Sequence, residues 1–148
     1  MCNMILKKGI TGFYDSKSPP VPEIDFKRFK TLCHTIDSCT QRRLIDIKSN
    51  PNCNYYSAEF DISSGIIYIL MNKYYPIVAF TEEINFGNFT FKDINDLNYL
   101  LTDYEVISAD ILNGSIDNVV NELSEPEMNQ VKYCNPVSVG NIIFNCWD

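Results

Sequence analysis

The chain has 148 residues, of which 45% are apolar and 21% charged, so it suits one globular domain over residues 1–148 and not a disordered chain. A chain of this length can bury a core without disulfides or metal. Its net charge of −7 opposes binding to nucleic acid and to anionic membranes. No apolar run has the length of a membrane span or a secretory signal, so we expect a cytoplasmic protein.

The first third of the chain predicts one long helix. Residues 4–8 favour a short strand, and residues 9–22 are rich in Gly, Pro and Ser, which is typical of a loop. A helix is predicted over residues 23–37, because apolar residues recur there at helical spacing. These residues are Phe29, Leu32, Cys33 and Ile36.

The middle of the chain predicts an antiparallel meander of four to five strands. The strands are expected at residues 44–48, 54–62, 65–71, 77–81 and 88–91. Residues 54–62 alternate between apolar and polar side chains, as in a half-buried strand, and Gly65 follows a short hairpin loop. The continuous apolar run at residues 65–71 favours the centre of the sheet.

The last third predicts several short helices. We expect them at residues 94–101, 108–112 and 115–123, then from Ser124 to the Asn135-Pro136 pair, and finally from Ser138 onward. Residues 104–107 favour neither helix nor strand. Ser124 and Glu127 have the spacing of a capping box. The fold class is therefore α+β, with the N-terminal and C-terminal helices expected on one face of the sheet.

The six cysteines do not predict a disulfide framework or a metal site. The chain lacks a secretory signal, has no Cys-x-x-Cys pair, and contains only one histidine, His34. We therefore expect reduced and mostly buried cysteines and no cofactor.

Nothing in the sequence has the pattern of a catalytic site. Cys33 and His34 are neighbours on one helix, so their side chains point about 100° apart. We expect a buried cysteine, a solvated histidine and no enzymatic activity. Catalysis by carboxylates stays open, and the alternative function is a small hydrolase or ligand-binding domain with a carboxylate-lined pocket.

Basic residues gather at one place but do not favour nucleic-acid binding. Three of them fall on the polar face of the first helix, where charges are usual, and the whole chain is acidic. The group consists of Lys27, Arg28, Lys30, Arg42 and Arg43.

The charges are distributed unevenly along the chain. Residues 82–128 hold eleven Asp or Glu and a single basic residue, Lys92, whereas residues 1–81 hold ten basic and seven acidic residues. Such a block attracts cationic surfaces, although it also suits a solvated face that keeps the protein soluble.

Three strings resemble segments of small bacterial proteins. They are residues 5–13, residues 75–80 with Phe86 and Gly87, and residues 139–148. Proteins of this kind are similar to the immunity proteins that accompany secreted bacterial toxins. The resemblance implies kinship of fold, and it implies a small acidic domain that neutralises a basic toxin, often a nuclease, by protein–protein contact.

The charge distribution and the resemblance together place the expected partner surface within residues 82–128. Charge complementarity speeds association, and tyrosine is favoured at binding hot spots. We expect the segment 103–105 to be the most exposed. The candidate residues are Asp103, Tyr104, Glu105, Asp110, Asp117, Glu122 and Glu125.

Overall fold

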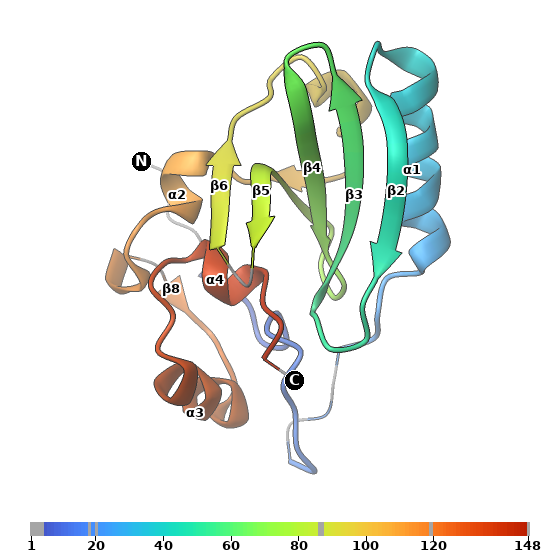
Figure 1. Cartoon of the computed structure of the whole chain (residues 1–148). Coiled ribbons are helices and arrows are strands. Elements are labelled where there is room, and N and C mark those ends of the chain that lie inside the picture. The colour runs from blue at the N-terminus through green and yellow to red at the C-terminus, as the bar shows by residue number, and fades with distance from the viewer. Residues whose placement is uncertain (1–4, 18, 20, 86–87, 119, 148) are drawn as a thin grey trace.

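The computed structural model describes residues 5–17, 19, 21–85, 88–118 and 120–147 (Figure 1). Five strands form an antiparallel meander in chain order, which confirms the predicted α+β class. They are β2 Arg43–Ser49, β3 Tyr55–Ile62, β4 Gly65–Asn72, β5 Ile77–Asn85 and β6 Asn88–Lys92. A short strand, β7 Glu105–Val106, pairs in parallel with the start of β5. Among the described residues, none of the helices is both long and apolar enough to cross a membrane.

The meander follows from local sequence features. In β3 the apolar residues bury one face, and Ser57 and Glu59 point to the other. The β3–β4 turn is closed by Gly65, whose φ of 140° is strained for residues with a side chain. The apolar strand β4 lies at the centre of the sheet, as predicted.

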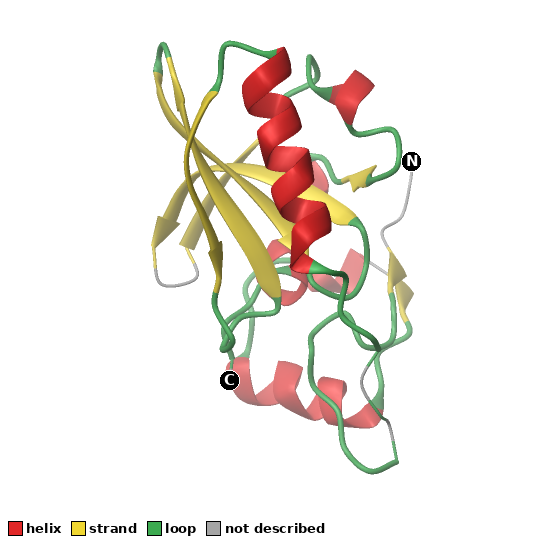
Figure 2. Ribbon diagram, turned by 90° about the vertical axis from the view of Figure 1, so that its right-hand side faces the viewer, coloured by secondary structure: helices red, strands yellow, loops and turns green. Residues whose placement is uncertain are grey.

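One face of the sheet is covered by helix α1, Phe26–Cys39 (Figure 2). The helix begins three residues later than predicted, because Asp25 caps it by accepting a hydrogen bond from the Lys27 amide at 2.9 Å. All four residues of the predicted apolar stripe are buried. They pack against alternate residues of the central strands, including Phe60, Ile69 and Phe80.

The opposite face is covered by the C-terminal third of the chain. Its elements are the 3-10 helix η2 Ile116–Asn118 and the α-helices α2 Ala109–Leu112, α3 Glu125–Cys134 and α4 Gly140–Ile143. The 3-10 helix η1 Asn98–Leu100 instead lies on the first face, where the flanking Leu97 and Leu101 pack in the same cluster as the buried residues of α1. The expectation that the C-terminal helices share a face with α1 holds for η1 and is wrong for α2 and α4. Val139, Ile142 and Phe144 pack with Leu70 and Ala79, whose side chains leave the sheet on the side away from α1. The unbroken apolar run of β4 reflects burial on both faces.

Two predicted helices do not form as expected. Only η1 lies within residues 94–101, and residues 115–123 contain η2 followed by the strand β8, Val120–Asn121. Strand β8 pairs in parallel with β1, Ile5–Leu6, so a partner distant in sequence overrides the helical spacing. Val119, on which that spacing depended, lies outside the described residues. The capping box at Ser124 and the end of α3 at Asn135 are confirmed.

Candidate functional site

Three buried asparagines tie both ends of the chain to one end of the sheet; we call Asn54, Asn72 and Asn145 the asparagine hub. The Asn72 amide group donates to the carbonyl oxygens of Ile10 and Ile143, at 2.9 and 2.8 Å. Asn54 donates to the same two carbonyls, at 2.8 and 2.9 Å. The carbonyl oxygen of the Asn54 side chain accepts from the Asn145 backbone amide at 2.7 Å. These bonds satisfy polar groups that would be costly to bury alone.

A second buried polar group, the carboxylate of Glu127, holds the N-terminal loop against α3. One oxygen accepts from the amides of Gly9, at 2.7 Å, and Ser124, at 3.0 Å. The other accepts from the Thr11 amide at 3.0 Å and from its hydroxyl at 2.5 Å. Glu127 is fully buried, so this member of the acidic segment 82–128 is structural and cannot meet a partner.

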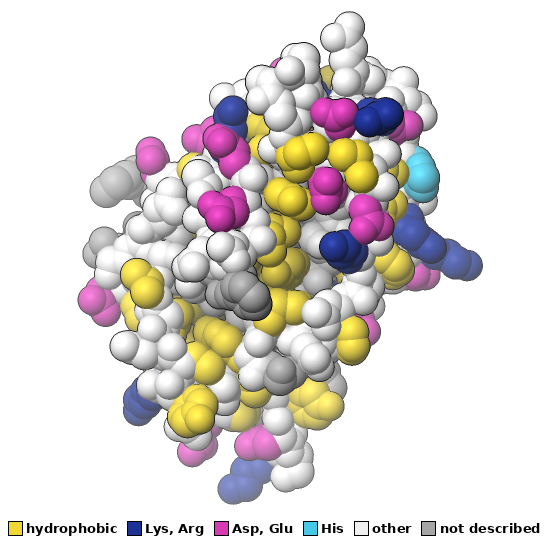
Figure 3. Space-filling model, viewed as in Figure 1, with side chains coloured by type: hydrophobic (Ala, Val, Ile, Leu, Met, Phe, Trp, Pro, Cys, Tyr) yellow, Lys and Arg dark blue, Asp and Glu magenta, His cyan; other side chains and the backbone are white. Residues whose placement is uncertain are grey.

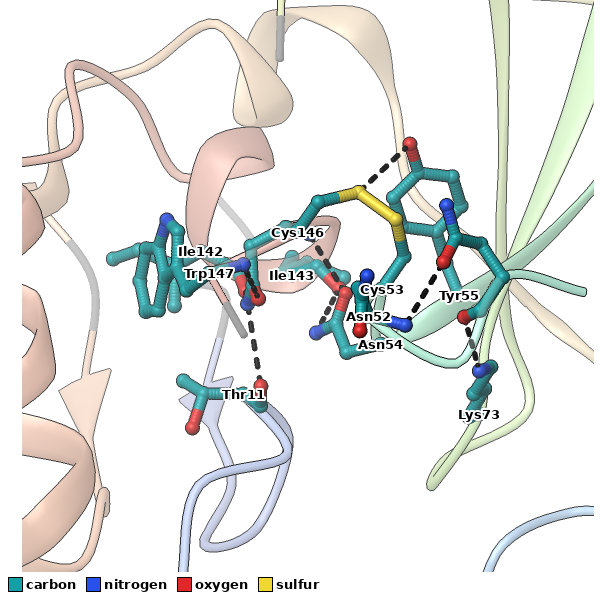
Figure 4. Close-up of a disulfide and its surroundings, with 12 residues drawn as sticks. Thr11, Asn52, Cys53, Asn54, Tyr55, Lys73, Ile142, Ile143, Cys146 and Trp147 are labelled. Atoms are coloured by element: carbon teal, nitrogen blue, oxygen red, sulfur yellow. Dashed lines mark hydrogen bonds between the residues drawn. A yellow bond between two sulfur atoms is a disulfide. The ribbon is translucent and has the colours of Figure 1, made fainter. Parts of the chain in front are cut away.

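A disulfide joins Cys53 to Cys146 across 93 residues of chain (Figure 4). The expectation of reduced cysteines is therefore wrong for this pair. Asn54 donates its backbone N–H to the Asn145 carbonyl at 2.9 Å, which places the two adjoining cysteines side by side. The Tyr55 hydroxyl lies 3.7 Å from the Cys146 sulfur. No feature of the sequence predicted that the segments around Cys53 and Cys146 lie side by side.

The hub also explains the three strings that carry the resemblance. Ile10 and Thr11 belong to the first string, and Ile143 and Asn145 to the third. The second string contributes Tyr75, whose hydroxyl donates to the Lys8 carbonyl and whose backbone amide donates to the Asn72 side chain at 3.1 Å. The strings therefore meet in one structural cluster. Phe86, Gly87 and Asp148 lie outside the described residues.

The remaining described cysteines are free thiols. Cys33 lies on the buried side of α1, and this burial raises the pKa of its thiol to about 12, so it stays protonated and unreactive. His34 is exposed, as expected. Cys39 is exposed and Cys134 is half-buried. Cys2 lies outside the described residues, among which no group of three or more His, Cys, Asp or Glu could hold a metal ion.

The basic residues near α1 are engaged by their own chain. The guanidinium group of Arg28 lies 4.9 Å from the centre of the Tyr104 ring. Arg42 pairs with Asp96 at 3.0 Å, and Arg43 pairs with Asp61 at 3.1 Å. These contacts reduce what the group could offer to nucleic acid.

The predicted partner residues are spread over several elements and do not form one patch. Asp103 and Tyr104 lie beside Arg28 of α1, and Glu105 lies in β7. Asp110 lies in α2, which packs with α4 and β6, near the opposite face of the sheet. Three others follow along the chain, at η2, after β8 and at the start of α3: Asp117, Glu122 and Glu125. Figure 3 shows acidic side chains scattered over the surface and not gathered.

The six carboxylates and Tyr104 differ in their availability. All six carboxylates are exposed, and among the described residues none forms an ion pair. Tyr104 is half-buried beneath Arg28, so the expectation that it is one of the most exposed residues is wrong. Its ring already has a cation as partner.

The structure also contains a groove of about 720 Å³ on the face away from α1; we call it the sheet groove. It is lined on the sheet side by Asp46 of β2, Tyr55 and Glu59 of β3, and Tyr68 of β4. Residues 134–137 and 144–147 form the facing wall. In Figure 3, which looks onto this face, a band of hydrophobic side chains runs down the middle of the view.

The groove brings together residues that sequence reasoning did not select. Asp46 lies directly opposite Glu59 in the β2–β3 ladder, and Glu59 lies opposite Tyr68 in the β3–β4 ladder. Burial, and then the negative charge of Glu59, raise the pKa of the Tyr68 hydroxyl. The alternation of β3 was visible in the sequence, but the register that aligns these three residues was not.

Comparisons with known protein-family models, curated proteins and solved structures found no match for this chain.

Proposed function

We propose that this protein is an immunity-type binding protein that neutralises a cationic toxin domain by protein–protein contact, without catalysis of its own. The observation that carries the proposal is the set of six exposed carboxylates in residues 103–125, none of which forms an ion pair with a described residue. Unpaired like charges repel one another, so mixed charges would keep the surface soluble at a lower cost in stability.

The scattered placement of these carboxylates supports a role in attraction from a distance. A potential summed over several elements steers an oppositely charged protein without requiring close contact with each charge. Fast capture suits an inhibitor that must reach its target before damage occurs. Asp103, Glu105 and Asp110 are the members that we propose to matter most. Tyr104 stays a member of the proposed surface, although its ring is half-buried beneath Arg28.

The cellular location is part of the same proposal. We place binding in the cytoplasm, where a toxin of the expected kind would act. The Cys53–Cys146 disulfide is typical of an oxidising compartment instead. Alkylation of thiols in intact cells, followed by mass spectrometry, decides between the two: labelled Cys53 and Cys146 support the cytoplasm, and a protected pair contradicts it.

The proposal is tested with the gene directly upstream. We expect it to encode a large secreted protein with a toxic C-terminal domain, and we expect co-expression of the present chain to restore growth. Calorimetry with an inactivated form of that domain should give a stoichiometric complex. Toxicity that persists in cells making the folded chain, with no complex in calorimetry, would contradict the proposal.

A second candidate function has one observation in its favour, because Asp46 and Glu59 both line the sheet groove. Two neighbouring carboxylates in a groove could serve a small hydrolase or a ligand-binding domain. This candidate predicts that the chain hydrolyses a small substrate and that Glu59→Gln abolishes the hydrolysis. The immunity proposal predicts no hydrolysis to abolish.

A further inference from the structure

The sheet groove exists because the C-terminal segment covers only part of the sheet face. Helix α4 spans four residues, and the wall it supports packs over Tyr55 and Leu70. Farther along the same face, Glu59 and Tyr68 are only half-buried, and Ile66 is 38% exposed. This part of the sheet has no covering element among the described residues.

The exposed part carries two neighbouring carboxylates, of which only Asp46 has an ion-pair partner among the described residues. Asp46 and Glu59 are direct cross-strand neighbours, and like charges at such positions destabilise a sheet. Glu59 forms no ion pair with a described residue, and the one cation near Asp46 is Lys48, at 3.8 Å. A cation from outside would therefore find two carboxylates at neighbouring positions.

The surroundings of this pair favour a guanidinium group over an ammonium. Tyr68 lies opposite Glu59 in the ladder, and Tyr55 and Trp147 also line the groove. Arginine binds carboxylates in a two-pronged manner and stacks on aromatic rings, whereas lysine behaves as a compact, strongly hydrated charge. A site with carboxylates and aromatic rings therefore binds arginine more favourably than lysine.

From these observations we propose that the sheet groove is the docking site for an arginine-bearing loop of a basic protein partner. The inference rests on the proposed function, because the partner is the cationic toxin domain. It deepens that function by separating two roles. The scattered carboxylates of residues 103–125 draw the partner in, and Asp46 and Glu59 hold it.

The groove is tested without a partner by NMR titration of the full chain, with acetyl-Gly-Arg-Gly-amide as the probe. We expect amide shifts centred on Asp46, Glu59 and Tyr68, and much smaller shifts with the glutamine peptide of the same length. Shifts that are equal for both peptides, or that lie only at α2 and α3, would overturn the proposal. So would a small dication, butane-1,4-diamine, that saturates the same amides at a tenfold lower concentration, since the groove would then suit a small molecule.

The matched variant is Asp46→Asn with Glu59→Gln, which removes both charges with little change of shape. Its melting temperature should rise slightly, because the repulsion is gone, so a loss of binding cannot be blamed on unfolding. The arginine peptide should no longer shift these amides. Shifts of unchanged size in the variant would overturn the proposal.

With the toxin domain in hand, the same variant separates this inference from the proposed function. We expect its complex to dissociate at least about tenfold faster, as is typical when one side of a charge pair is removed. A complex of unchanged lifetime would overturn the groove as docking site and leave the proposed function standing. The absence of any complex with the unaltered chain would overturn the proposed function itself. It would also overturn the proposal that a protein partner occupies the sheet groove.

Discussion

The two faces of the sheet are covered by different kinds of structure. Helix α1 covers one face with a regular apolar stripe, and the buried residues of that face are almost all apolar. The other face is covered by loops and helices of four to ten residues. These are fixed by the asparagine hub, by Glu127 and by the Cys53–Cys146 disulfide. The irregular cover of the second face leaves the sheet groove open.

Removing a buried aromatic ring of α1 is expected to have the greatest effect. Phe29 is fully buried and stacks near Tyr56, with ring centroids 5.8 Å apart. Phe29→Ala should lower the free energy of unfolding by about 3–5 kcal/mol, measured by urea denaturation. Tyr133→Ala removes a ring that is 86% exposed and should change stability by less than about 0.5 kcal/mol. Equal losses in the two variants would show that burial on this face does not govern stability.

Breaking the disulfide should have the next largest effect, and it concerns the other face. The bond closes a loop of 93 residues, so its removal should lower the free energy of unfolding by about 3–4 kcal/mol. Cys53→Ser with Cys146→Ser should show this as a drop in melting temperature, and a reductant should reproduce the drop in the unaltered chain.

The matched control for the disulfide is Cys39→Ser, which removes an exposed thiol that forms no disulfide. Its melting temperature should stay unchanged, and the reductant should still lower it. A melting temperature that no reductant alters would show that the asparagine hub alone holds the C-terminal segment.

The hub itself can be weakened at Asn72, whose side chain also accepts hydrogen bonds from the amides of Tyr74 and Tyr75, at 2.8 and 3.1 Å. Asn72→Ala leaves these two amides without that partner and should lower the free energy of unfolding by about 2–3 kcal/mol. Hydrogen exchange should then accelerate in residues 9–12 and 142–146 but not in α1. Asn98→Ala, at an exposed asparagine, is the control. Uniform acceleration over the whole chain would mean that the two faces unfold together.

The contrast between the faces also explains what the sequence could predict. The stripe Phe29, Leu32, Cys33 and Ile36 and the alternation of β3 are local patterns, and both predicted their elements correctly. The second face depends on side-chain bonds between residues up to 134 positions apart, such as that from Asn145 to the Thr11 carbonyl. Periodicity records neither such bonds nor the pairing of β8 with β1, and that pairing is why the helix predicted at residues 115–123 failed.

The candidate site likewise has features that local sequence patterns predicted and features that depend on contacts between distant segments. The acidic excess of residues 82–128 was visible as composition, and the capping box identified Glu127 as a local feature. The bonds from Gly9 and Thr11 that bury Glu127 were not visible, because they link distant segments. The pairing of Asp46 with Glu59 needs the register of two strands, with a bulge between Leu44 and Asp46 that shifts it.

The smallest effect on stability is expected at the outer carboxylates, and it would separate attraction from docking. Asp103→Asn, Glu105→Gln and Asp110→Asn together should change the free energy of unfolding by less than about 0.5 kcal/mol, because all three side chains are exposed. Association with the toxin domain should slow about tenfold at low salt, since these charges steer the approach.

At 1 M salt, where the Debye length is about 3 Å, the triple variant and the unaltered chain should associate at the same rate. Stopped-flow fluorescence of the single tryptophan, Trp147, which lies in the groove wall, can follow both reactions. The groove variant Asp46→Asn with Glu59→Gln is the matched comparison, because it should change the dissociation rate and leave the association rate at high salt unaltered. If the triple variant associates at the unaltered rate even at low salt, residues 103–110 are an ordinary solvated surface, and attraction as well as docking belongs to the groove.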